Sequence, residues 1–383
     1  MGHGVRATLN RVFSTILTSR TLRSLRRARY GLPRALSGKA VVHYFHQSDD
    51  PYSQLTAQLL KPLADAYRIE IKSHLVSPPD NAAAPERERL AKLALEDAAL
   101  LARAYGLKFP AQDARPPTAE LGGDALRKRL GHYLGAMFYF EGEWYWGIDR
   151  LHFLEERLHA AGLAKTTGPL KPIAPVKDVT FSPAKATGAT LDYFLSFRSP
   201  YTYLAIPRVR KLAEHYGARL RLRFVLPMVM RGLPVPAPKR LYILLDTKRE
   251  AERLGMPFGT VVDPVGKGVE RGLAVLHHAI QAGKGPEFAE SFLRGVFAEG
   301  IDAASDTGLY KLAQRAGLDR DLVQRALKDE SWRKVAEANR KELFALGLWG
   351  VPSFRVNQNR PHWGQDRLWA IEQDLQAAKQ ETP

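Results

Sequence analysis

Strand-like and helix-like patterns alternate in the second half of the chain. Residues 190–197 are mostly β-branched, aromatic and apolar residues that predict a buried strand, and the pattern breaks at a polar residue followed by proline. Ser199 stands where a helix N-cap is expected and Pro200 stands at the first helical position. Residues 220–224 alternate apolar side chains with arginine, so a second strand follows and the segment predicts a βαβ unit.

The pattern then stays helical over a long stretch. Residues 239–345 show helical periodicity interrupted by single glycines, which predicts a helical insertion. Residues 350–356 predict another strand, residues 358–359 a turn, and residues 363–366 a last step from strand to helix. The second half therefore ends on a ββα unit.

The chain also contains an internal repeat. Residues 42–53 match residues 191–202, and the Trp-Gly-Xaa-Asp-Arg-Leu run at 146–151 matches the run at 363–368. Two copies of one α/β unit explain both matches. Residues 165–187, which are rich in proline, glycine and lysine, predict the linker between the copies.

With 383 residues, the chain is long enough for two domains that each bury a core. We therefore expect a basic leader over residues 1–38, a first domain over 39–164 and a second over 188–383, each domain being α/β with a helical insertion.

Composition limits the chemistry of this chain. It contains no cysteine, which excludes protein disulfides, thiolate metal sites and catalytic cycles on its own thiols. Any thiol chemistry must use a thiol that a ligand supplies. His277 and His278 lack a third residue at metal-ligand spacing, so no metal site is expected. No apolar run reaches membrane-spanning length or forms a secretory signal, and we expect a cytoplasmic protein.

The net charge of +17 is concentrated at the start of the chain. The nine basic residues that precede the first acid, Asp49, are Arg6, Arg11, Arg20, Arg23, Arg26, Arg27, Arg29, Arg34 and Lys39. One interpretation is an amphipathic helix that lies on an anionic membrane or nucleic acid. Its apolar side would consist of Leu9, Val12, Phe13, Ile16 and Leu17. We favour a tail that docks on its own domain, because a single apolar stripe usually finds protein. An organellar transit peptide has a similar composition. No specific nucleic acid is expected, and anionic-membrane contact through residues 1–36 stays open.

Four motifs in order carry a family resemblance. They are Ser-Pro-Tyr-Thr at 199–202, Lys-Arg-Leu-Tyr at 239–242, Gly-Val-Pro at 350–352 and Gly-Gln-Asp-Arg-Leu at 364–368. Together they resemble the DsbA-type branch of the thioredoxin superfamily. Within that branch, they are similar to 2-hydroxychromene-2-carboxylate isomerases and kappa-class glutathione transferases. The resemblance covers about residues 189–378 and, with the repeat, implies two tandem thioredoxin-like (DsbA-type) domains.

The resemblance implies glutathione as the cofactor. A thiol with a pKa near 8.5 is mostly protonated at neutral pH, so such a site must favour the thiolate. Ser199 at a helix N-terminus would do so through its hydroxyl and nearby backbone amides. The competing interpretation is that Ser199 is only a helix cap, worth about 1 kcal/mol.

The other implied glutathione contacts are Lys239, Val351, Pro352, Gln365 and Asp366. Pro352 resembles the family's cis-proline, which presents the Val351 backbone to the cysteinyl part of the tripeptide. Lys239 would meet a carboxylate, and Gln365 with Asp366 would receive the γ-glutamyl end. A turn proline, a surface lysine and a capping aspartate are the simpler interpretations.

The first domain departs from this pattern. Asp50 replaces Ser199, and the counterpart of Pro352 is Met137 or Ala136. Asp149 already occupies the place of Asp366, where a cap or ion pair explains it. Because a carboxylate at the helix start repels a thiolate, we interpret this domain as a degenerate copy. A role for Asp50 as a general base is the alternative.

The leading hypothesis is a glutathione-dependent isomerase or transferase acting on a small hydrophobic, aromatic and acidic electrophile. The alternative is a non-catalytic binding or scaffold protein with a thioredoxin-like groove. A self-contained disulfide oxidoreductase is excluded by the missing cysteines. Whether the chain forms a homodimer stays open.

Overall fold

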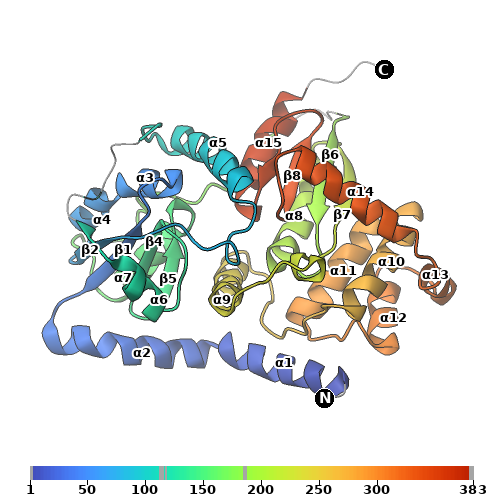
Figure 1. Cartoon of the computed structure of the whole chain (residues 1–383), viewed down its shortest axis with the longest axis horizontal. Coiled ribbons are helices and arrows are strands. Elements are labelled where there is room, and N and C mark those ends of the chain that lie inside the picture. The colour runs from blue at the N-terminus through green and yellow to red at the C-terminus, as the bar shows by residue number, and fades with distance from the viewer. Residues whose placement is uncertain (1–2, 112–115, 117–118, 184–187, 379–383) are drawn as a thin grey trace. The chain divides into compact units, whose positions relative to one another are not determined.

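The computed structural model describes residues 3–111, 116, 119–183 and 188–378 (Figure 1). Two residues of the predicted leader and residues 184–187 of the predicted linker lie outside these ranges. The chain divides into two compact units. The N-terminal unit comprises Arg20–Lys177 and Val235–Tyr242, and the C-terminal unit comprises Met1–Ser19, Asp178–Pro234 and Ile243–Pro383.

A four-stranded sheet forms the centre of the C-terminal unit, in the order β7-β6-β8-β9. Its strands are β6 (Thr190–Leu195), β7 (Arg219–Phe224), β8 (Ser353–Val356) and β9 (His362–Trp363). β6 is parallel to β7 and antiparallel to β8. All the strands predicted for this half are confirmed, and the side chains of β6 are almost entirely buried because it is a central strand.

Helices account for the rest of this unit. They are α8 (Pro200–His215), α9 (Ala237–Arg253), α10 (Lys267–Gln281), α11 (Gly285–Ala298), α12 (Asp306–Arg315), α13 (Arg320–Ala326), α14 (Trp332–Ala345) and α15 (Leu368–Ala377), with short 3-10 turns η2 (Met228–Arg231) and η3 (Gln365–Arg367). The predicted helical insertion is confirmed and forms the cluster of helices drawn in orange in Figure 1. Phe197 stacks on Phe292 with ring centroids 4.0 Å apart, which joins the insertion to the end of β6.

The N-terminal unit has a five-stranded sheet in the order β3-β2-β1-β4-β5. Its strands are β1 (Val41–His46), β2 (Glu70–Leu75), β3 (Ala119–Glu120), β4 (Met137–Phe140) and β5 (Glu143–Trp146). Its further helices are α3 (Pro51–Ala57), α4 (Leu60–Ala66), α5 (Arg87–Tyr105), α6 (Gly123–Arg129), η1 (Ile148–Arg150) and α7 (Leu151–Ala160). β1 is parallel to β2 and antiparallel to β4, as β6 is to β7 and β8.

Tyrosine hydrogen bonds also repeat between the units. Tyr44 donates its hydroxyl to the Ser53 carbonyl at 2.8 Å, and Tyr193 donates to the Thr202 carbonyl at 2.9 Å. In both units the donor and acceptor are nine positions apart. The repeat therefore extends from the sequence to the contacts between the first strand and the first helix.

A second pair of tyrosines connects the helix after the first strand, α3 or α8, to a later helix of the same unit. Tyr52 donates to the Asp97 carboxylate at 2.9 Å, and Tyr201 donates to the Asp246 carboxylate at 2.8 Å. The separation is 45 positions in both cases. Both aspartates are buried, so each hydroxyl helps to satisfy a carboxylate that is removed from water.

The strand pairing identifies the first-domain counterpart of Pro352. Ala136 directly precedes β4 as Pro352 directly precedes β8. The Gly147 amide donates to the Ala136 carbonyl at 2.7 Å, and the Gly364 amide donates to the Pro352 carbonyl at 2.9 Å. Of the two predicted counterparts, Ala136 and not Met137 therefore occupies the equivalent position.

Two helices form the leader, α1 (His3–Leu17) and α2 (Arg20–Ser37). In the C-terminal unit, the Arg11 guanidinium donates to the Gly300 carbonyl at 2.7 Å and Ser14 Oγ accepts from the Val261 amide at 2.9 Å. In the N-terminal unit, α2 forms ion pairs from Arg27 to Glu143 at 3.0 Å and from Arg34 to Glu141 at 2.6 Å.

The expectation that the leader docks on its own domain therefore fits α2, whereas α1 contacts the C-terminal unit. The expectation that an apolar stripe makes the contact is wrong for α1. The contacts are polar, and the predicted apolar stripe of α1 faces away from them, with Leu9 52% and Phe13 65% exposed. None of the helices in the described ranges is long and apolar enough to cross a bilayer.

The paired tyrosines give a test of the repeat. Tyr52→Phe and Tyr201→Phe should each lower the free energy of unfolding by about 1.5 kcal/mol, because each removes one hydrogen bond to a buried carboxylate. Urea titration measures this change. Tyr30→Phe, at a tyrosine that is 45% exposed, is the control and should change little. If all three variants are equally stable, the hydrogen bonds of Tyr52 and Tyr201 do not make the matching contributions to stability that we expect.

Candidate functional site

Ser199 lies at the N-terminus of α8. It adopts extended dihedrals of φ −97° and ψ 113°, and its Oγ accepts from the Thr202 amide at 3.2 Å. The predicted N-cap is therefore confirmed. The same Oγ also donates to the Val351 carbonyl at a long 3.4 Å. The hydroxyl thus joins the start of α8 to the loop before β8.

The loop that holds Val351 and Pro352 is closely packed. The Val351–Pro352 peptide bond is cis, as the resemblance implies, and Pro352 is buried. A Cβ on Gly350 would lie 2.3 Å from the Trp363 ring, so only glycine fits beside β9. Ser353 Oγ donates to the Gly350 carbonyl at 2.8 Å and closes the turn. These contacts determine where the Val351 backbone lies relative to Ser199.

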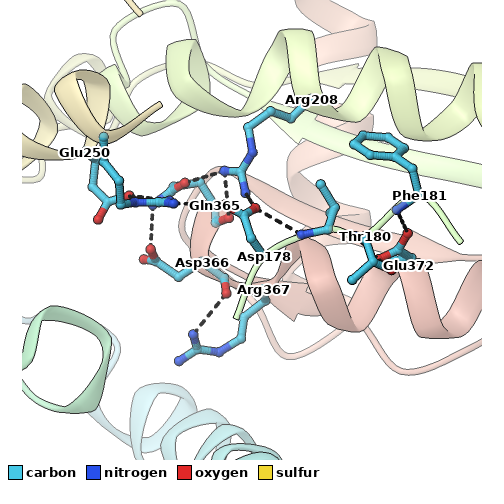
Figure 2. A network of polar contacts seen from close by, with 11 residues as sticks. Asp178, Thr180, Phe181, Arg208, Glu250, Gln365, Asp366, Arg367 and Glu372 are labelled. Atoms are coloured by element: carbon cyan, nitrogen blue, oxygen red, sulfur yellow. Dashed lines mark hydrogen bonds and ion pairs between the residues drawn. The ribbon is translucent and has the colours of Figure 1, made fainter. Parts of the chain in front are cut away.

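Gln365 belongs to a closed ring of polar contacts (Figure 2). Its Oε1 accepts from Arg208 at 2.7 Å, and its Nε2 donates to Glu250 at 3.3 Å. Two ion pairs to Asp178 continue the ring, from Arg208 at 2.6 Å and from Arg253 at 2.8 Å. The Arg253–Glu250 ion pair, at 3.0 Å, completes it.

The ring places opposite charges around a buried amide. Burial opposes the ionisation of Asp178, but the guanidinium groups of Arg208 and Arg253 outweigh it and hold the pKa of that carboxyl below its usual value. Gln365 is only 1% exposed, and its oxygen and nitrogen both bond to protein groups. The ring therefore fixes η3 against α8 and α9.

Asp366 directly follows this amide. Its Oδ1 accepts from Gln365 Nε2 at 2.5 Å, and its side chain is partly exposed. Gly364, with φ of 100°, begins the turn in a conformation that favours glycine. Because the Gly364 amide donates to the Pro352 carbonyl, the Gln365–Asp366 turn is tied to the cis-proline loop.

Lys239 belongs to the N-terminal unit. It is in the first turn of α9, within the part that belongs to the N-terminal unit, and its Nζ donates to the Ala83 carbonyl at 2.8 Å. Burial lowers its pKa to about 8. The described contacts of the C-terminal unit thus connect Ser199, Val351, Pro352, Gln365 and Asp366.

The four charged residues of the ring around Gln365 are not predicted from the sequence. Asp178 falls in the predicted linker, and the others are Arg208, Glu250 and Arg253. Glu250 and Arg253 stand one helical turn apart, which is a signal for an ion pair but not for its place in a ring. No pattern in the sequence pairs Arg208 with Asp178, 30 positions earlier.

Asp50 occupies the place of Ser199 in the N-terminal unit. It caps α3, and its Oδ2 accepts from the Ser53 amide at 2.9 Å and from Ser53 Oγ at 2.7 Å. Burial raises the pKa of Asp50 to about 6, although the bonds from Ser53 oppose the shift. Asp50 therefore caps its helix as Ser199 does. It brings a carboxyl group where the C-terminal unit has a hydroxyl, which is the difference on which the degenerate-copy interpretation depends.

Comparison with known proteins defines the class of the C-terminal half. Residues 190–376 match the model of the DSBA-like thioredoxin domain, so this half of the chain is a DSBA-like thioredoxin domain.

Among curated proteins, the chain is similar to 2-hydroxychromene-2-carboxylate isomerase of Pseudomonas putida, with 23% identity over 48% of this chain and 92% of the relative. The protein of the same name from Sphingobium xenophagum is 24% identical over 49% of this chain and 97% of the relative. A solved structure of 2-hydroxychromene-2-carboxylate isomerase aligns with a TM-score of 0.42 at 22% identity, over 49% of this chain and 94% of that one.

The raised pKa of Asp50 gives a test by pH. Its contribution to stability is present at low pH and is lost as the pH rises through about 6, because the folded state favours the protonated form. Asp50→Asn keeps the cap without the charge. Relative to the wild type, we expect the free energy of unfolding of Asp50→Asn to be about 1 kcal/mol higher at neutral pH than the same comparison gives in acid. The effect is modest because the side chain is only partly buried.

Asp319→Asn is the matched control. Asp319 also caps a helix, accepting from the Leu322 amide at 2.7 Å, but it is exposed. Urea titrations of both variants at several pH values measure the effect. A pH dependence identical to that of the wild type in Asp50→Asn would contradict the assignment.

Proposed function

We propose that the C-terminal unit binds glutathione and acts as an isomerase or transferase on a small hydrophobic, aromatic and acidic electrophile in the cytoplasm. The observation that carries the proposal is the position of the Ser199 hydroxyl, which lies at the N-terminus of α8 and is directed at the Val351 carbonyl beside Pro352. The similarity to proteins named 2-hydroxychromene-2-carboxylate isomerase supports the class of reaction.

The hydroxyl of Ser199 has the capacity for both of its predicted roles. A serine oxygen has one hydrogen to donate and two lone pairs that accept. Capping uses a lone pair, since Oγ accepts from the Thr202 amide. The hydrogen points to Val351 at 3.4 Å, which is a weak bond that a sulfur anion replaces at little cost. The 16-residue helix behind Ser199 adds its positive end to that position.

The remaining residues fit a tripeptide along the loop and the turn. Val351 would present backbone groups to the cysteinyl part, and Asp366 would receive the γ-glutamyl ammonium. Gln365 fits less simply, because its side chain is already bonded to Arg208 and Glu250. We therefore propose that Gln365 mainly positions Asp366. Lys239 donates to the Ala83 carbonyl, and its contact with a glutathione carboxylate stays a prediction.

Glutathione, when bound, would supply a nucleophilic sulfur for addition to the electrophile, with later loss of the sulfur in an isomerase and its retention in a transferase. The chain provides the rest: Ser199 and the start of α8 favour the anionic form of the thiol over the protonated one. No step requires a cysteine of the protein, which agrees with the composition.

We propose that the N-terminal unit is a second thioredoxin-like copy without this activity. Its sheet and tyrosine bonds parallel those of the C-terminal unit. At the decisive position, however, the Asp50 carboxyl would disfavour a neighbouring thiolate once ionised. The alternative, a non-catalytic binding protein, would show retained peptide binding without measurable glutathione affinity.

Ser199→Ala distinguishes an enzyme from a scaffold. It should raise the pKa of the thiol of bound glutathione and lower turnover about ten- to a hundredfold, because it removes one hydrogen bond to a charged group. Most of the affinity for glutathione should remain. Ultraviolet thiolate absorbance against pH measures the pKa. Ser305→Ala is the matched control, because Ser305 caps α12 by accepting from the Gly308 amide at 3.0 Å. If the Ser199→Ala and wild-type titrations coincide, the serine is only a cap.

Asp366→Asn tests the γ-glutamyl end. Removing the charge should weaken glutathione binding about tenfold, since the lost partner is an ammonium group. Isothermal titration calorimetry of the full chain measures the affinity. Asp149→Asn, at the counterpart that follows Gly147, is the control and should bind like the wild type. The reverse result, with weakened binding only in Asp149→Asn, would place the ligand in the N-terminal unit.

A further inference from the structure

Helix α1 has two opposite faces. The face that packs on the C-terminal unit consists of small or polar residues, of which Ala7, Ser14 and Thr18 are buried. The opposite face is apolar and exposed: Val5 is 55%, Leu9 52%, Val12 51%, Phe13 65% and Ile16 54% exposed. Because the polar face is already bonded to Gly259, Gly300 and Val261, the helix cannot turn its apolar face inward without losing those contacts.

Helix α2 repeats this arrangement on the N-terminal unit. Gly31 is buried on the docked face, between Arg27 and Arg34, which form ion pairs with Glu143 and Glu141. On the other face, Leu25 is 62%, Leu32 58% and Leu36 87% exposed. The stripes at 5, 9, 12, 16 and at 25, 29, 32, 36 have the same helical spacing. Each helix is thus held to protein by its polar face and presents its apolar face outward.

Charge identifies the partner for these faces. Nine basic residues and no acid precede Asp49. Arg11, Arg26, Arg27 and Arg34 bond to the protein on the docked faces, and Arg29 lies within the exposed stripe of α2. An interfacial helix combines such a basic surface with an apolar face, and arginine there extends its guanidinium to the headgroups. A second copy would bring two cationic leaders together, which like-charge repulsion disfavours. Nucleic acid is contacted through phosphates by polar groups, which leaves the leucines without a partner.

We propose that the exposed apolar stripes of α1 and α2 bind the surface of an anionic lipid bilayer. The acyl region takes up the leucine, valine, isoleucine and phenylalanine side chains, and the arginines attract the negative headgroups. The helices stay bonded to the protein through their polar faces, so the protein would associate with the bilayer surface as a peripheral protein. This inference is independent of the proposed glutathione chemistry.

The test is sedimentation of the full chain with vesicles of phosphatidylcholine, alone or mixed with phosphatidylglycerol. We expect binding to the mixed vesicles that weakens with added salt. The combined substitution Leu25→Gln, Leu32→Gln and Leu36→Gln should reduce this binding at least about tenfold, as should Leu9→Gln with Phe13→Gln and Ile16→Gln. Thermal unfolding should be unchanged, because all six side chains are exposed.

Leu95→Gln with Leu121→Gln is the matched control, since these leucines are 53% and 85% exposed and lie outside the leader. The control should bind vesicles like the wild type. Equal binding by all variants, or no binding by the wild type, overturns the proposal. So does a wild-type dimer that the leucine substitutions convert to a monomer, which would make a second copy the occupant. Binding of duplex DNA that survives the substitutions, without vesicle binding, would also overturn it.

Discussion

The candidate site depends on the antiparallel pairing of β8 with β6. This pairing brings Ser353 opposite Phe194 and so places the loop before β8 next to the end of β6, where α8 begins. Ser199 and Val351 are 152 positions apart in the chain and meet through it. A helix start alone offers a cap, and a proline loop alone offers a turn. The sheet brings the helix start and the proline loop together, so that a hydroxyl, a helix N-terminus and an extended backbone lie next to each other.

The N-terminal unit repeats this scaffold with different side chains at the corresponding positions. Its β1–β4 pairing, its tyrosine bonds and the amide bond to Ala136 repeat those of the other unit. The difference lies in two side chains, because Asp50 replaces a hydroxyl with an acid and Ala136 replaces the proline. A carboxyl with a pKa of about 6 is mostly ionised at neutral pH, and its negative charge disfavours a neighbouring anion.

Local signals in the sequence predicted the elements well. The N-cap at Ser199, the buried strand β6 and the helical insertion depend on residues close to each other in the chain, and all are found. The ring around Gln365 could not be predicted, because it depends on which of many charged residues the fold brings together. The docking face of α1 was also missed, since an apolar stripe was expected to pack on protein and polar side chains do so instead.

The ring constrains how the proposed ligand would be recognised at the turn after β9. The Gln365 amide bonds to Arg208 and Glu250 and donates to Asp366, and two ion pairs to Asp178 hold its partners. Releasing the amide for a ligand would leave buried charged groups with fewer partners, which costs more than one new hydrogen bond returns. Asp366, which is partly exposed and lies next to the fixed amide, is therefore the group of this pair that is suited to meet a ligand.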